Sequence, residues 1–204
     1  MVLSYEPVAD GELVALVTFL EMRERPEIAV PTSTLDLRRE MSIAPDAYRD
    51  LFRRVGAPWL WFSRLTRSDA ELTAILHHPQ VDLFAVVDGN GRDVGMLELD
   101  YRTAGECELA FVGLVPEMSG MGHGRWLLAE ALHRAWRDGV GRVHVHTCTL
   151  DHPAALSAYR RAGFTPYRRA LERFRDPRLT GILPRDCAPQ VPLLGTLATD
   201  APAT

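Results

Sequence analysis

The chain has 204 residues, of which 47% are hydrophobic, and its formal net charge is -4 at pH 7. This length and apolar content are enough for one well-buried core, so we expect a single domain over residues 1–175 and a Pro-rich tail over residues 176–204. An acidic chain is a poor match for nucleic acid or an anionic membrane, because both favour a basic protein face.

Targeting and cross-linking signals are absent from the sequence. No apolar run approaches the roughly 18 residues that span a bilayer, and the start lacks the basic and apolar blocks of a signal peptide, so we expect a cytoplasmic protein. Cys107, Cys148 and Cys187 show neither metal-ligand nor disulfide-framework spacing, and we interpret them as free thiols with no metal site. All 23 basic residues are arginines, so the chain has no side-chain amine.

The first third of the chain predicts one strand and two helices. Residues 13–20 are β-branched and aromatic and too short for a helix, which predicts a buried strand, the first of the sheet. Pro45 suits the first turn of a helix that Gly56 and Pro58 end. The buried stripe of that helix is Tyr48, Leu51, Phe52 and Val55. Ser68 and Glu71 form a capping box for a second helix, which ends before Pro79.

The middle of the chain predicts an antiparallel meander. Residues 83–87 and 94–99 are two strands joined by a tight turn at residues 88–91, a sequence of the kind that needs positive φ. A second turn at residues 103–105 leads into a third strand, residues 107–115. The meander therefore ends directly before a glycine-rich stretch.

Three alternate glycines, Gly120, Gly122 and Gly124, separate this third strand from an amphipathic helix over residues 122–138, with Gly139 as its left-handed cap. Glycine lets the backbone approach a ligand closely, and the unpaired N–H groups of the first helical turn suit phosphate. The same turn would serve equally as a plain connection between two elements.

The strand over residues 142–149 should lie parallel to the strand before the helix, by the right-handed crossover rule. A short helix carrying Tyr159 follows it. Gly163 and Phe164 end this helix and begin a last strand through about Phe174.

Two of these segments, in this order, resemble motifs of the GNAT superfamily of acetyltransferases. The first runs from Leu114-Val-Pro through the glycines, and Ser119 stands where the family has Arg or Gln. The second, Asp151-His-Pro-Ala to Tyr159-Arg-Arg-Ala-Gly-Phe164, is similar to the family's Asn-x-x-Ala…Tyr-x-x-x-Gly-Phe signature, with Asp151 or His152 in place of Asn. The resemblance covers roughly residues 82–170.

The resemblance implies an α/β fold with a mixed, mostly antiparallel sheet, flanked by helices, and one parallel strand pair at the acyl-CoA site. It also implies acetyl-CoA as co-substrate and a small-molecule or peptide amine as acceptor. A homodimer is compatible with the sequence. The residues that it assigns to the cofactor are Leu114, Val115, Gly120, Met121, Gly122, His123, Gly124, Arg125 and His152.

Direct acetyl transfer needs a base for the ammonium and an acid for the departing thiolate. Tyr159 matches the family tyrosine beside the thioester sulfur and can donate a proton. Glu108 alternates with apolar residues on its strand, so burial should raise its pKa, and a base glutamate stands at a similar place in some family members. A salt-bridged Glu108 is the alternative, and Glu106 is a weaker candidate.

The region after the first strand forms the acceptor wall in this family, which makes Trp59, Trp61 and Arg64 candidate acceptor residues; core packing is the alternative for each ring. His144 and His146 alternate on one strand face, where packing is favoured over a metal pair. A catalytically inactive acyl-CoA-binding module remains the competing function. A dinucleotide-binding domain is excluded, because Arg125 occupies the place of its third glycine.

Overall fold

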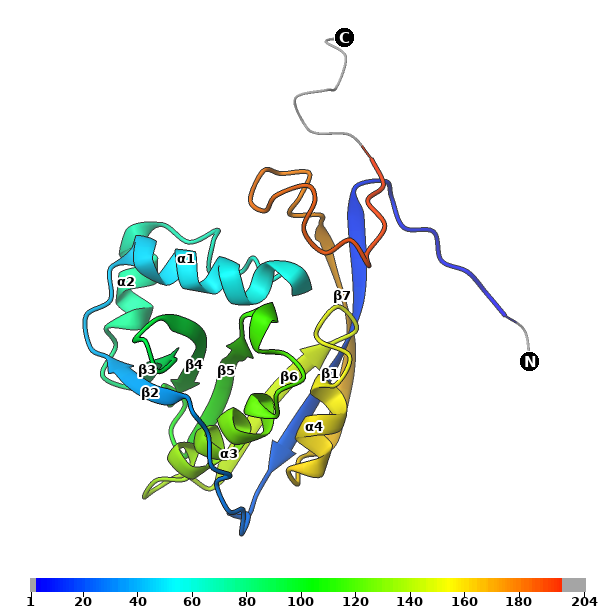
Figure 1. Cartoon of the computed structure of the whole chain (residues 1–204). Coiled ribbons are helices and arrows are strands. Elements are labelled where there is room, and N and C mark those ends of the chain that lie inside the picture. The colour runs from blue at the N-terminus through cyan, green and yellow to red at the C-terminus, as the bar shows by residue number, and fades with distance from the viewer. Residues whose placement is uncertain (1–2, 196–204) are drawn as a thin grey trace.

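The computed structural model describes residues 3–195 and contains one seven-stranded sheet in the order β2-β3-β4-β5-β6-β1-β7 (Figure 1). All neighbouring strands are antiparallel except β5 and β6, which are parallel. The mixed α/β fold with one parallel pair is therefore confirmed. The strands are β1 (Glu12–Met22), β2 (Asp36–Glu40), β3 (Val81–Val87), β4 (Asp93–Asp100), β5 (Glu106–Leu114), β6 (Arg142–Cys148) and β7 (Thr165–Arg175).

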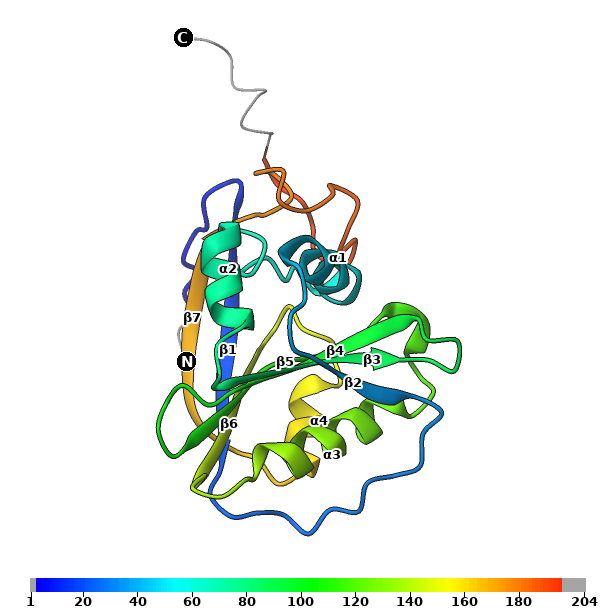
Figure 2. The same cartoon turned by 90° about the vertical axis from the view of Figure 1, so that its left-hand side faces the viewer.

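Helices cover both faces of the meander. They are α1 (Pro45–Gly56), α2 (Asp69–Leu76), α3 (His123–Ala135) and α4 (Ala155–Arg161), with short 3-10 turns η1 (Ala57–Trp59) and η2 (Pro116–Met118). The helix α1 lies on one side of β3, β4 and β5, and α3 and α4 lie on the other (Figure 2). The capping box at Ser68 and Glu71 is present as predicted. None of the helices in residues 3–195 has the length and apolar character to cross a membrane.

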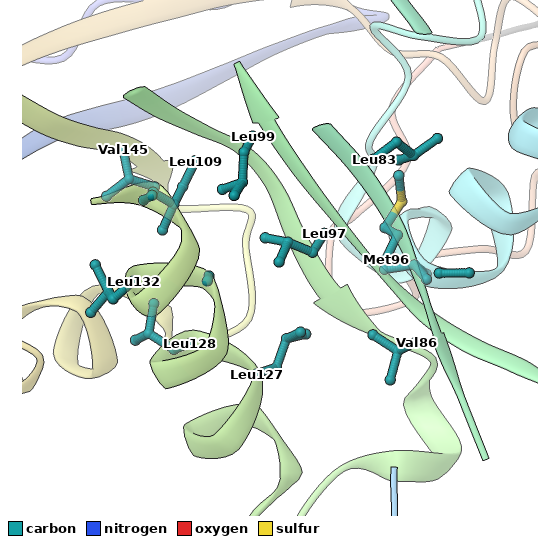
Figure 3. Close-up of a cluster of buried hydrophobic side chains, with 14 of the residues drawn as sticks. Leu83, Val86, Met96, Leu97, Leu99, Leu109, Leu127, Leu128, Leu132 and Val145 are labelled. Carbon is teal, nitrogen blue, oxygen red and sulfur yellow. The ribbon is translucent and has the colours of Figure 1, made fainter. Parts of the chain in front are cut away.

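The core lies on both faces of β4, whose six middle residues are all buried. Figure 3 shows Leu127 of α3 beside Leu97 on one face, whereas Met96 and Leu83 occupy the opposite face, toward α1. A strand covered on both sides reads as a continuous apolar run rather than an alternating one. The buried carboxylate of Glu98 is the exception on this strand, and it is paired with Tyr48 and Arg64.

The predicted first strand is confirmed as β1, and it lies inside the sheet rather than at its edge. It lies between β6 and β7 and is antiparallel to both, with Phe19 opposite His146 on one side and Arg168 on the other. Apolar patterning indicates that a strand is buried and does not name its partners. The outcome places an N-terminal strand beside the two segments that carry the second motif.

Two elements, α3 and β2, differ from expectation. The helix α3 ends at Ala135 rather than residue 138, because Trp136 leaves the helical region with ψ 86, although Gly139 is left-handed as expected. The strand β2 was not predicted at all. It is an edge strand of sequence DLRRE, held by ion pairs from Arg38 and Arg39, and has no apolar alternation to reveal it.

Residues 176–195 pack on the domain rather than leaving it. Arg178 is 2% exposed; its guanidinium pairs with Asp176 and donates to the carbonyl oxygen of Val191. Leu183 and Ala188 form a small second core with Leu60. The part of the expected tail beyond residue 195 lies outside the described residues.

Gly113 on β5 lets α1 and the following turn approach the sheet closely. A Cβ there would lie 2.6 Å from Val55 Cγ1 and 3.2 Å from Trp61 Cη2. We expect Gly113→Ala to lower the free energy of unfolding by about 1–3 kcal/mol through overpacking. Urea denaturation measures this, with Gly141→Ala as control, since a Cβ at Gly141 would meet nothing within 4 Å. Equal midpoints for the two variants would contradict the prediction.

Candidate active site

The parallel strands β5 and β6 separate along their length. They pair only over residues 106–108 and 142–144, although β5 continues to Leu114 and β6 to Cys148. A cavity of about 930 Å³ opens where they part, lined on one side by residues 109–114 and on the other by residues 145–148. The facing backbone edges of these segments do not pair with each other and are open to an extended ligand.

A bulge in β5 marks the point of separation. Leu109 pairs with Leu99 and Phe111 pairs with Glu98, so Ala110 between them has no partner on β4. Strict alternation along the strand predicts one common face for Glu108, Ala110 and Val112, but a bulge interrupts the alternation, so this prediction is wrong beyond Leu109. Ala110 also lines the cavity, which brings an irregular stretch of backbone to its centre.

The glycine turn forms one end of the cavity. Gly120 and Gly122 have φ of +77 and +82, and Gly122 precedes α3 without a side-chain cap. The backbone N–H groups of residues 120–124 have no acceptor among the residues that the structure describes. The N–H of Arg125 already donates to Gly122 O (3.1 Å), so the open amides are those before it.

Space and charge at this end suit a phosphate-bearing ligand. A Cβ on Gly120, Gly122 or Gly124 would meet nothing within 4 Å, so the space in front of the turn is open. The side chains of Arg125 and Arg161 line the same cavity and add positive charge to the positive end of the α3 dipole. Arg161, on α4, was not among the predicted residues, since its place in the cavity wall depends on the fold.

Only some of the other residues assigned to the cofactor line the cavity. Leu114 and His152 line the cavity, whereas Met121 is 63% exposed and does not. The backbone of Val115 has no free hydrogen-bonding group for a ligand, because its N–H donates to Val94 O and its carbonyl accepts from Met118 N. The His123 ring lies 3.2 Å, Nδ1 to Oγ, from Ser33 in the linker between β1 and β2.

Tyr159 lies on α4 and lines the cavity, with its ring 5.8 Å from that of Phe164 in an edge contact. Burial, helped by the negative charge of Asp151, raises the pKa of the Tyr159 phenol above its usual value. A phenol with a raised pKa keeps its proton at neutral pH. The Tyr159 phenol in the cavity wall is therefore protonated at neutral pH.

Glu108 does not have the environment that we expected. Its Oε1 lies 3.4 Å from His146 Nδ1, and contact with this imidazole holds the pKa of Glu108 below its usual value although burial opposes the shift. The expectation of a raised pKa is wrong, because a partner on β6 outweighs desolvation. Glu106 is paired more firmly, with Arg142 at 2.9 Å, and neither glutamate lines the cavity.

Of the three residues assigned to the acceptor, two lie at the cavity. The indole Nε1 of Trp61 donates to Asp151 Oδ1 (2.9 Å), and the ring of Trp59 lies 5.0 Å from that of His152. Arg64 instead pairs with the buried Glu98 and stacks on Phe111, and does not line the cavity. The charge of Arg64 is therefore neutralised by a buried carboxylate and does not face the cavity.

The sequence placed Asp151 at the position of the motif Asn but did not predict its contacts. Besides Trp61 it accepts hydrogen bonds from Thr147 Oγ1 and Cys148 N, both at 2.8 Å. It thereby connects the turn after β6 to Trp61, which follows η1. Glu172 and Phe174 of β7 also line the cavity, and no local pattern predicted them because their placement depends on the β1–β7 pairing.

Two separating parallel strands with an open helix N-terminus between them form a site for an extended ligand that carries negative charge. The family model "Acetyltransferase (GNAT) family" matches residues 45–164. Since the match covers more than half of the chain, the chain belongs to the GNAT acetyltransferase family. No curated protein matches the chain significantly in sequence.

Solved structures show the same fold at low identity. A GCN5-related N-acetyltransferase from Sphaerobacter thermophilus has a TM-score of 0.57 and 20% identity over 79% of this chain and 52% of that one. An aminoglycoside acetyltransferase from an uncultured soil metagenomic sample has a TM-score of 0.51 and 18% identity over 64% of this chain and 88% of that one. This chain thus spans about half the length of the Sphaerobacter protein.

A third similar structure is the spermidine/spermine N-acetyltransferase SpeG from Vibrio cholerae, with a TM-score of 0.50 and 22% identity over 66% of this chain and 81% of that one. At such identities the likeness concerns the fold alone. The family membership supports acetyl transfer in general.

Proposed function

We propose that this protein is an N-acetyltransferase that moves an acetyl group directly from acetyl-CoA to an amine. One observation carries the proposal: a single cavity connects the open amides of the glycine turn with Tyr159 and the aromatic wall of Trp59 and Trp61. Phosphates and an acceptor can therefore occupy opposite ends of one continuous site.

The residues present fit acetyl-CoA. The amides of residues 120–124 with Arg125 and Arg161 suit its phosphates, and the unpaired edge of β5 suits an extended chain carrying amide groups. When bound, acetyl-CoA supplies an activated acetyl group as a thioester. Backbone N–H groups of β5 at and beyond the bulge are donors for the carbonyl oxygen.

Two side chains move protons in this proposal. Tyr159 gives a proton to the departing sulfur. Glu108 provides the negative charge that draws a proton from the ammonium group of the acceptor, directly or through an intervening group. General acid–base groups of this kind typically contribute on the order of 10²–10⁴ in rate.

Direct transfer is favoured over an acetyl-cysteine intermediate. Burial raises the pKa of Cys148 to about 11 and that of Cys107 to about 12, so both thiols stay protonated at neutral pH and are weak nucleophiles. Because the chain contains no lysine, it also offers no side-chain amine to acetylate.

We expect incubation with acetyl-CoA alone to leave the intact mass unchanged, apart from at most one acetyl group on the α-amino terminus. Electrospray mass spectrometry measures this, with acetyl-CoA and bovine serum albumin as a lysine-rich control for spontaneous labelling. A stable acetyl adduct on Cys148 or Cys107 would contradict direct transfer and indicate a ping-pong enzyme.

The function is tested by thiol release with a panel of amines. The panel includes an aminoglycoside and spermidine, because two of the structurally similar proteins are named as acetyltransferases of these amines. It also includes amino acids and peptides with a free N-terminus. We expect release that depends on both substrates. Acetyl-CoA binding without release by any amine would instead identify an inactive acyl-CoA-binding module, which Ser119 at the family's Arg or Gln position keeps as the second candidate.

A further inference from the structure

Two glutamate–histidine pairs lie side by side on one face of the sheet. Glu106 Oε2 is 3.5 Å from His144 Nε2, and Glu108 Oε1 is 3.4 Å from His146 Nδ1. Glu106, Glu108 and His144 lie in the stretch where β5 and β6 pair, and His146 lies two residues beyond it on β6, where the strands have separated. The two pairs have the same chemistry but differ in what they face.

Only His146 reaches the cavity. It is one of the lining residues, whereas His144, Glu106 and Glu108 are not. The side chain of His146 is 50% exposed, and that of His144 is 21% exposed. Since Nδ1 of His146 faces Glu108, the ring nitrogen left for another partner is Nε2, which forms no side-chain hydrogen bond within residues 3–195.

From this arrangement we propose that His146 is the catalytic residue that takes the proton from the acceptor amine through Nε2, and that Glu108 is a positioning residue that acts through His146. The inference rests on the proposed function and names the group that stands between Glu108 and the amine. A carboxylate that orients an imidazole and stabilises its protonated form is an established way to build a general base.

The electrostatic surroundings agree with this role. The Glu108 carboxylate raises the pKa of His146, against the effect of burial, and the charges of Asp151 and Glu172 act in the same direction. Burial lowers the pKa of His144, the neighbouring histidine on β6. On β7, the guanidinium of Arg168 stacks over Phe19, whose own ring lies 5.8 Å from that of His146.

The acceptor R-NH3+ and the thioester give the amide, the thiol and one H+ overall. The first proton leaves the ammonium nitrogen for His146 Nε2 and is then released to solvent. The second leaves the same nitrogen as its bond to the acetyl carbon forms and the carbon–sulfur bond breaks, and it replaces the proton that Tyr159 gives to the sulfur.

The test compares His146→Gln, Glu108→Gln and the control His144→Gln in steady-state turnover from pH 5 to pH 10. A base must be deprotonated to act, so turnover rises with pH through the pKa of His146. His146→Gln should lower turnover about 10²–10⁴-fold and abolish this rise, with partial recovery at high pH where the amine deprotonates by itself. His144→Gln should behave as wild type.

Glu108→Gln separates positioning from direct proton transfer. Gln keeps an oxygen for the Nδ1–H but removes the negative charge that raises the pKa of His146. The rise in turnover should therefore persist and move to lower pH, with a smaller loss on the plateau than in His146→Gln. Two-dimensional NMR of the imidazole resonances should show the same downward shift of the His146 pKa, independently of turnover.

Calorimetry should show wild-type acetyl-CoA affinity in all three variants, since none of these residues belongs to the glycine turn. His146→Gln with turnover within twofold of wild type would overturn the inference, as would a Glu108→Gln enzyme that loses the pH-dependent rise while His146→Gln retains it. A wild-type protein that releases no thiol with any amine would instead contradict the proposed function, and the inference would fall with it.

Discussion

Gly124→Val is expected to abolish measurable acetyl-CoA binding without unfolding the protein. Gly124 lies in the first turn of α3, lines the cavity, and a Cβ there would meet nothing within 4 Å in the free protein. The isopropyl group would therefore occupy only the space in front of the open amides. Hydrogen bonds to charged groups contribute about 1.5–3 kcal/mol each, so the loss of two weakens binding by about two to four orders of magnitude.

Isothermal titration calorimetry with acetyl-CoA measures the effect, and thermal unfolding checks the fold. Gly141→Val is the matched control, because Gly141 also has open space at its Cβ position and lies outside the cavity. Gly122→Val should bind as poorly as Gly124→Val, yet it is a less clean test, since Gly122 has φ +82 and any side chain there adds backbone strain. Wild-type affinity in Gly124→Val would place the acetyl-CoA site elsewhere.

The sequence predicted those parts of the site that local motifs encode. The glycine turn and Tyr159 each belong to a short segment in which residue spacing fixes the backbone, and both segments line the cavity. The antiparallel meander was predictable for the same reason, since tight turns at residues 88–91 and 103–105 leave the strands little choice of partner. These features depend on contacts that are close in sequence.

Long-range pairing was not predictable from one sequence. The insertion of β1 between β6 and β7 joins residues more than a hundred positions apart, and it brings Glu172 and Phe174 to the cavity. The environment of Glu108 depends on another long-range pairing, that of β5 with β6. A single register position on β6 sets His146 beside this carboxylate, and that contact reversed the expected direction of its pKa shift.

The net charge of -4 does not oppose the proposed binding of a polyanionic co-substrate, because the charges are unevenly distributed. Arg125, directly after the glycine turn, and Arg161 line the cavity, whereas Asp151 and Glu172 lie near His146. Local fields in a cleft depend on the charges that line it more than on the net charge of the chain. The same separation favours an acceptor that carries a positive charge, which agrees with an ammonium group as the form that enters the site.

Tyr159→Phe is expected to lower turnover on the order of 10²–10⁴-fold, and high pH should not restore it. Phe keeps the edge contact with Phe164 and removes only the hydroxyl, so the fold and acetyl-CoA affinity should be unchanged. The lost step is proton donation to the sulfur. Raising the pH deprotonates the amine, which helps the attacking nitrogen and leaves the departing thiolate without its donor.

The pH dependence distinguishes this variant from His146→Gln, whose turnover should recover in part as the medium becomes basic. Thiol release measured from pH 5 to pH 10 on one amine acceptor gives both profiles, and Tyr167→Phe serves as a control because Tyr167 lies on β7 outside the cavity. Burial raises the pKa of Tyr159, so the wild-type phenol keeps its proton throughout the neutral range and its donor capacity falls only in strongly basic medium. A Tyr159→Phe enzyme with wild-type turnover, or one that high pH rescues, would show that water or another group protonates the sulfur.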